Sequence, residues 1–143
     1  MAYVKNWLHC VWGTKNRIPY LSGNILREVL NHIRAYAEQK KIYIDAINGY
    51  KDHIHCLISL SADQTLAKTM QLLKGESSFW INKNKLTEIK FEWAVEYFGV
   101  SVSESHLHKV REYILNQQNH HNIQSWENEY AEFISGYKFN IGH

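Results

Sequence analysis

Two histidines separated by one apolar residue open an alternating stretch, "DHIHCLISL", at His53 and His55. Successive side chains of a β-strand point to opposite faces, so this spacing predicts both imidazoles on one face and Ile54 on the other. Two neighbouring imidazoles can bind the same metal ion. Two ligands alone hold a catalytic metal poorly, so the site needs a third. Asp52 is a poor choice, because the alternation turns its side chain away from His53.

The same spacing recurs at His106 and His108, with a different meaning. The stretch "SESHLHKVREYILNQQN" predicts a long helix from Ser103, as its cap, to about Asn119. Residues i and i+2 of a helix point about 200° apart, so these two imidazoles cannot share one ion. We interpret both as surface or helix-start residues, with His106 able to complete the Ser103 cap.

This last helix supplies two further groups with possible chemical roles. Leu107, Val110 and Ile114 form an apolar stripe that predicts packing on a sheet. Tyr113 and Gln117 are one turn apart at the edge of that stripe. A glutamine amide oxygen suits Mg²⁺ or Mn²⁺, and a tyrosine beside it would have its hydroxyl close to the ion. The plainer alternative is a tyrosine at the edge of the core beside a solvated glutamine.

Alternation and β-forming residues predict strands over 4–12, 42–49 and 53–60, and one or two within 91–102. A short turn around Gly49 would join the second and third strands into a hairpin. The first strand and the next helix are joined by a loop, with Lys15 and Arg17 exposed.

Helical spacing predicts helices over 25–39 with Asn24 as N-cap, from the cap Asp63 to about Asn82, and after Ser103. A short helix from Trp126 to Ile134, stopped by Gly136, is also predicted. The order predicts an α+β fold in one domain, 1–143. It is a ferredoxin-like antiparallel sheet with helices packed on one face, plus a C-terminal tyrosine-bearing helix.

Composition bounds the class of protein. The chain has 143 residues, 45% hydrophobic and 21% charged, which is typical of a globular domain and not of a disordered one. The net charge of +2 permits nucleic-acid binding without requiring it. We find no membrane-length apolar run and no signal-peptide pattern. Cys10 and Cys56 read as small buried residues, not a disulfide framework, so we expect a cytoplasmic protein.

The histidine strand and the tyrosine helix, in this order and separation, resemble the HUH-superfamily single-tyrosine transposases of small bacterial insertion sequences that move as single-stranded DNA. The resemblance covers almost the whole chain, through "HCVWGTKNR", "INGYKDHIHCLISL", "LLKGESSFWIN", "FGVSVSES" and "VREYILNQQNHH". One departure is visible. The family's Trp-Gln-x-Gly-Tyr stands here as "WAVEY", with Ala94 and Glu96 in place of Gln and Gly.

The resemblance implies that His53, His55 and Gln117 bind one divalent cation, Mg²⁺ or Mn²⁺, and that Tyr113 is the nucleophile. Tyr113 would form a 5′-phosphotyrosine and free a 3′-hydroxyl, and reversal by another strand's 3′-hydroxyl would join strands. The family also implies recognition of DNA hairpins near the element's ends, and a homodimer. Whether Tyr113 serves its own chain or its partner stays open.

Basic residues and one tryptophan are candidates for contacts with DNA. Lysines and arginines bind phosphates without sequence preference, and an exposed tryptophan can stack on an unpaired base. Trp80 could equally lie in the core, and the basic residues could form an ordinary solvated surface. The candidates are Lys15, Arg17, Lys68, Lys74, Trp80, Lys83 and Lys85, with Ser77 and Ser78 beside them.

Three rival interpretations predict different behaviour. A metal-dependent phosphodiesterase that uses water would not need Tyr113. A non-catalytic nucleic-acid-binding module would bind through sheet aromatics such as Trp7 and Tyr43, and would survive chelation. A domesticated transposase would keep the chemistry but act on chromosomal repeats.

Overall fold

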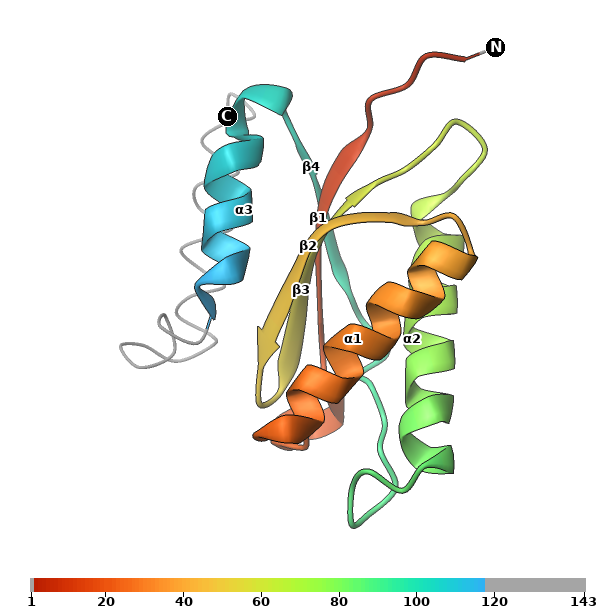
Figure 1. Cartoon of the computed structure of the whole chain (residues 1–143), viewed down its shortest axis with the longest axis vertical. Helices are drawn as coiled ribbons and strands as arrows, with labels where there is room; N and C mark the ends of the chain where they lie inside the picture. Colours follow the sequence, from red (N-terminus) through yellow and green to blue (C-terminus); the bar gives the residue numbers. More distant parts are fainter. Residues whose placement is uncertain (1, 118–143) are drawn as a thin grey trace.

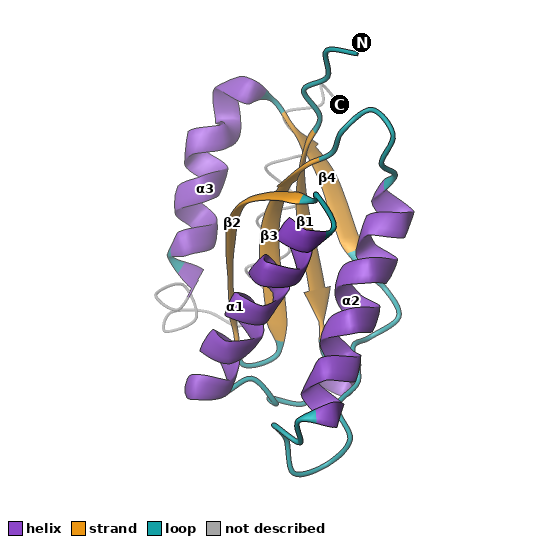
Figure 2. Cartoon of the chain, turned by 45° about the vertical axis from the view of Figure 1, so that its right-hand side comes forward, coloured by secondary structure: helices purple, strands orange, loops and turns teal. Residues whose placement is uncertain are grey.

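The structure is a computed structural model, and it describes residues 2–117. A four-stranded antiparallel sheet has the strand order β2-β3-β1-β4. This order and the alternation of strands and helices confirm the predicted ferredoxin-like α+β fold (Figures 1 and 2). The elements are β1 (Trp7–Gly13), α1 (Asn24–Gln39), β2 (Tyr43–Tyr50), β3 (His53–Ser59), α2 (Leu66–Lys83), β4 (Phe98–Val102) and α3 (Leu107–Leu115).

The two faces of the sheet are covered by different helices. α1 and α2 pack on one face, and α3 lies on the other (Figures 1 and 2). The larger core lies under α1 and α2 and includes Ile54, Cys56 and Ile58 of β3. A smaller cluster under α3 joins Leu57 to Val110 and Ile114, with Leu107 partly buried beside it. The alternation of β3 and the apolar stripe of α3 are therefore both confirmed.

Several boundaries differ from the sequence-based prediction. Thr65, not Asp63, caps α2, because its hydroxyl accepts a hydrogen bond from the Lys68 N–H. Asp63 instead accepts a bond from the Ser61 hydroxyl, before the helix starts. Gly23 is the N-cap of α1, and Asn24 is the first helical residue.

The turn of the β2–β3 hairpin is at 51–52, two residues later than predicted. Gly49 lies inside β2, paired with Ile54. A Cβ added at Gly49 would lie 2.5 Å from the His53 carbonyl oxygen. Glycine at position 49 therefore lets β2 approach the backbone of His53 closely. The sequence had suggested a different role for this glycine, in the hairpin turn.

The start of the tyrosine helix also differs in detail. Ser103 precedes a short 3-10 turn, Glu104–His106, and α3 follows it. The Ser103 hydroxyl makes its bond to His106 Nδ1, at 2.6 Å. The exposed His108 lies 3.2 Å from Glu112, and the half-buried His106 ends the turn before α3, so the second pair consists of a helix-start residue and a surface residue, as predicted. The predicted helix over 126–134 and the end of the tyrosine helix beyond 117 lie outside the described residues.

Candidate active site

His53 and His55 lie on the face of β3 that α3 covers. Both are fully buried, and their ring centroids are 5.1 Å apart. The alternating pattern predicted this shared face. A histidine that binds a metal through one ring nitrogen usually donates the other N–H to a neighbour, which fixes the tautomer and the ring orientation, so the partners of the Nδ1 atoms matter for what the pair can do.

Asp52 holds His53. Its Oδ1 lies 2.7 Å from His53 Nδ1, so the prediction that Asp52 points away is wrong. Asp52 lies in the hairpin turn, where strand alternation does not apply. A carboxylate that accepts from Nδ1–H fixes the tautomer in which Nε2 has the lone pair. Asp52 is therefore an orienting group beside a possible ligand.

His9 holds His55 and is a site residue that the sequence reading missed. His9 Nε2 lies 2.9 Å from His55 Nδ1, and both rings are buried. Burial lowers the pKa of His9 to about 3, so the imidazole is neutral near pH 7. The repeated His-Cys pair, His9-Cys10 and His55-Cys56, was a usable signal. It needed the knowledge that β1 lies beside β3, with Cys10 opposite Cys56.

Tyr113 packs edge-on against this histidine cluster. Its ring centroid is 5.7 Å from that of His55 and 6.2 Å from that of His9, within one chain. Gln117 is fully buried and donates from Nε2 to the Tyr113 carbonyl at 3.1 Å. Among residues 2–117, Gln117 Oε1 has no hydrogen-bond partner. A buried amide oxygen without a donor is unusual and is suited to receive a cation.

Two polar contacts fix α3 to β2. Arg111 donates to Asp45 Oδ2 at 2.8 Å, and Asn48 Nδ2 donates to the Leu115 carbonyl at 3.0 Å. Asp45 lies at the register shift between Ile44 and Ala46, where β2 has one residue more than β3. Such a bulge re-aims a side chain, here towards α3. Asn48 is opposite His55 in the register, so this contact ends beside the histidines.

The donor set fits a divalent cation. His53 and His55 each engage a neighbour through Nδ1, so Nε2 is the nitrogen of each ring that is suited to bind a metal, and Gln117 can add an oxygen. Nitrogen and oxygen donors of this kind suit Mn²⁺ and related ions. Residues 2–117 contain no group of three His, Cys, Asp or Glu placed to share a metal. The candidate set is consistent with this, because its third member is a glutamine.

Comparison with known proteins places the chain in a family. The family model described as "Transposase IS200 like" matches residues 2–117. The chain belongs to this family. It is similar to the ISDra2 transposase TnpA of Deinococcus radiodurans, with 25% identity over 114 residues, 76% of this chain and 81% of the relative.

Two solved structures share the fold of this IS200-like transposase. A transposase crystal structure from D. radiodurans R1 has a TM-score of 0.67 and 24% identity, and the match covers 82% of this chain and 95% of that one. A REP-associated tyrosine transposase bound to a REP hairpin has a TM-score of 0.62 and 15% identity, and the match covers 81% of this chain and 68% of that one. The fold prediction is thus supported by both neighbours.

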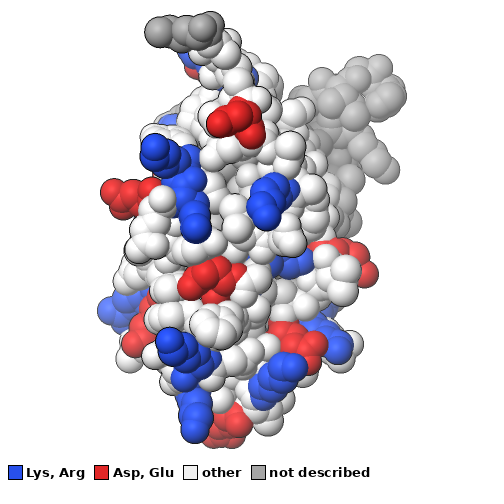
Figure 3. All heavy atoms as spheres, turned by 90° about the vertical axis from the view of Figure 1, so that its right-hand side faces the viewer, with Lys and Arg blue, Asp and Glu red and all other residues white. Residues whose placement is uncertain are grey.

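The candidate DNA contacts of this IS200-like transposase lie in two separate places. Lys68, Lys83 and Lys85 belong to α2 and the turn after it, on the face of the sheet opposite Tyr113. Viewed from the side of α2, basic and acidic side chains are interspersed, without a continuous basic patch (Figure 3). Lys15 and Arg17 lie instead at the end of β1, and Lys15 pairs with Glu92 at 3.1 Å.

Two of the candidates have structural partners. Lys74 Nζ donates to the carbonyls of Ala94 and Val95 at 2.7 and 3.0 Å, and lies 3.4 Å from that of Glu96. Burial lowers the pKa of Lys74. Trp80 is partly buried against the core and stacks on His32, with centroids 4.0 Å apart. Both side chains therefore contribute to the packing of the fold.

None of the helices within residues 2–117 is long and apolar enough to cross a membrane.

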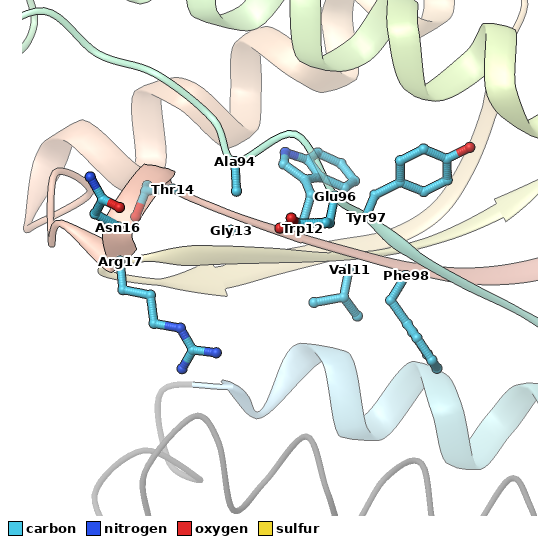
Figure 4. Close-up of a pocket in the computed structure, with 10 residues that line it drawn as sticks. All are labelled: Val11, Trp12, Gly13, Thr14, Asn16, Arg17, Ala94, Glu96, Tyr97 and Phe98. Carbon is cyan, nitrogen blue, oxygen red and sulfur yellow. The ribbon is translucent and has the colours of Figure 1, made fainter.

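A pocket opens where β1 and the chain before β4 separate. Its volume is about 340 Å³, and its lining includes Val11, Gly13, Arg17, Glu96 and Phe98 (Figure 4). Val11 is paired with His55 on one side and Phe98 on the other. The pocket therefore begins one strand away from the second site histidine, about 5 Å across the sheet.

Proposed function

We propose that this IS200-like transposase cleaves and rejoins single-stranded DNA with Tyr113 as the nucleophile. The observation that carries the proposal is the contact of Tyr113 with His55 and His9, one turn from the Gln117 amide oxygen, which has no hydrogen-bond partner within residues 2–117. The contact of this tyrosine with two buried imidazoles supports a role as nucleophile over that of an ordinary tyrosine at the edge of the core.

His53, His55 and Gln117 would hold one divalent cation, Mg²⁺ or Mn²⁺. When bound, such an ion polarises a phosphate and stabilises negative charge on a departing oxygen. Asp52 and His9 orient the two imidazoles through their Nδ1 atoms. The chain would thus contribute two oriented imidazoles on the buried strand β3 and one amide oxygen just after α3.

In the proposed reaction the Tyr113 phenolic oxygen attacks the scissile phosphorus. A bond forms between the tyrosine oxygen and phosphorus, and the bond from phosphorus to the 3′ oxygen breaks. The tyrosine loses its proton to solvent, and the departing 3′ oxygen takes one up. The product is a 5′-phosphotyrosine and a free 3′-hydroxyl. Attack by another strand's 3′-hydroxyl reverses the step and joins the strands without an external energy source.

The substrate that we propose is single-stranded DNA that folds into hairpins near the ends of the element, bound by a homodimer. The similarity to a transposase bound to a REP hairpin supports a folded strand as ligand. The same similarity supports a second candidate function, that of a domesticated transposase that acts on chromosomal repeats. Repeat hairpins and element ends can be offered to the protein side by side, and sedimentation can measure the dimer.

A denaturing gel tests the nucleophile. Wild type, Tyr113→Phe and the matched control Tyr36→Phe are incubated with labelled single-stranded DNA from the element's ends, with Mg²⁺ or EDTA. We expect a slow protein–DNA band in wild type and Tyr36→Phe, lost with EDTA and in Tyr113→Phe. Cleavage that persists in Tyr113→Phe would identify water as the nucleophile. Binding without cleavage by every variant would favour the non-catalytic module.

A further inference from the structure

The segment between Trp93 and β4 departs from regular pairing. The β1–β4 ladder ends at Val11 and Phe98, and the next backbone bond runs from the Ala94 N–H to the Gly13 carbonyl at 2.9 Å. Residues 95–97 thus stand opposite the single residue Trp12. A bulge of this size opens the edge of the sheet and forms the 340 Å³ pocket.

The bulge is held in place and is not a loose loop. Lys74 reaches from α2 to the carbonyls of Ala94, Val95 and Glu96. Its ammonium also lies 5.6 Å from the centre of the Tyr97 ring. The backbone of the bulge is therefore fixed from the side of α2.

The pocket has two chemically different sides. Figure 4 shows Val11 and Phe98 extending towards α3, the side on which Tyr113 lies, with Arg17 directed the same way. The Glu96 carboxylate is turned towards β1 in the same view. Arg17 has a left-handed backbone, φ 56°, which a non-glycine residue adopts only where its surroundings impose it. An apolar floor, one carboxylate and one guanidinium therefore meet in one concave site.

We propose, on the basis of the proposed function, that this pocket receives one unpaired nucleobase of the DNA strand that reaches Tyr113. The half-buried Phe98 contacts the base, with the buried Val11 beneath it, and Arg17 faces the backbone phosphates. A carboxylate repels phosphates but accepts hydrogen bonds, so Glu96 selects a base with an exocyclic amino group over thymine. The volume of 340 Å³ lies in the range of small-ligand sites.

Fluorescence anisotropy in EDTA tests the preference without cleavage. The probes are labelled (dC)12, (dA)12 and (dT)12 at low salt, with unlabelled dCMP as competitor to separate recognition of a free nucleotide from that of a strand. We expect wild type to bind (dC)12 and (dA)12 about threefold to tenfold more tightly than (dT)12, the effect of one hydrogen bond. Glu96→Gln should reduce this ratio below about twofold.

Glu88→Gln is the matched control, because it removes one exposed glutamate charge outside the pocket. It should keep the wild-type ratio. Ala94→Gln, which fills the pocket without a charge change, should abolish the preference, and circular dichroism confirms that each variant is folded. Equal binding of the three probes by wild type, no binding of any, or equal effects of Glu96→Gln and Glu88→Gln would overturn the proposal. If the Tyr113 adduct still forms in that case, the pocket alone is refuted and the proposed function stands.

Discussion

His9 Nε2 lies 2.9 Å from His55 Nδ1, in a buried pair that links β1 to β3. We expect His9→Ala to weaken Mn²⁺ binding about tenfold to a hundredfold, because an unsupported imidazole loses its orientation. Electron paramagnetic resonance of Mn²⁺ with the DNA-free protein measures this directly. His9→Gln, whose amide can replace the hydrogen bond, should recover part of the affinity.

The matched control for His9 is His32→Ala, which removes a histidine paired with Glu76 on the other face of the sheet. It should lower stability without changing Mn²⁺ affinity. An unchanged affinity in His9→Ala would show that His55 needs no orienting partner.

Acid should destabilise the protein partly through His9. Its pKa is about 3 when folded and near 6.5 when unfolded, so between these values the unfolded chain binds the extra proton. The free energy of unfolding should therefore fall as the pH drops from 6.5 towards 3, by at most about 1.4 kcal/mol per pH unit for this group. Urea titrations of wild type and His9→Gln across this window measure the difference. If the free energy of unfolding had the same dependence on pH in wild type and in His9→Gln, His9 would not contribute to the acid sensitivity.

The Asp45–Arg111 pair should matter more for reaction rate than for stability. Arg111 is partly exposed, so Asp45→Asn should lower the unfolding free energy by only about 1 kcal/mol. Loosening α3 should still slow the formation of the Tyr113 adduct several-fold, because the tyrosine loses its fixed place. Single-turnover gels and melting curves separate the two effects. The double variant with Asp45→Arg and Arg111→Asp, which exchanges the two charges, should restore part of the rate of adduct formation. Wild-type rates of adduct formation in Asp45→Arg alone and in Arg111→Asp alone would contradict the prediction.

Gly49→Ala should disturb the site from the far strand. The new Cβ would lie 2.5 Å from the His53 carbonyl oxygen, so β2 or β3 must move, at a cost of about 1–3 kcal/mol. Gly75→Ala is the control, because nothing lies within 4 Å of its added Cβ in α2, and alanine favours a helix by about 1 kcal/mol. Thermal melts should move in opposite directions. A stable Gly49→Ala variant with intact Mn²⁺ binding would contradict the expected strain.

Features that depend on periodicity were predicted best from the sequence. The shared face of His53 and His55, the apolar stripe of α3 and the order of elements all arise from repeats of two or of about four residues. The features that were not predicted depend on which elements are neighbours in space and on where the turns fall. His9 joins the site only because β1 lies beside β3, and Asp52 reaches His53 only because it lies in a turn. The bulge at 94–98 is likewise set by Lys74, twenty residues away on α2.

Within residues 2–117, the two sides of the sheet differ in how many apolar side chains they bury. The cluster beneath α1 and α2 contains most of the large buried side chains, whereas α3 covers a small one. Regions with few buried contacts open locally before the whole protein unfolds. Backbone amides of α3 should therefore exchange with deuterium sooner than those of β1 and β3. Among the elements within residues 2–117, the residue proposed to carry the DNA covalently would then belong to one that opens early, while both histidines stay on a buried strand.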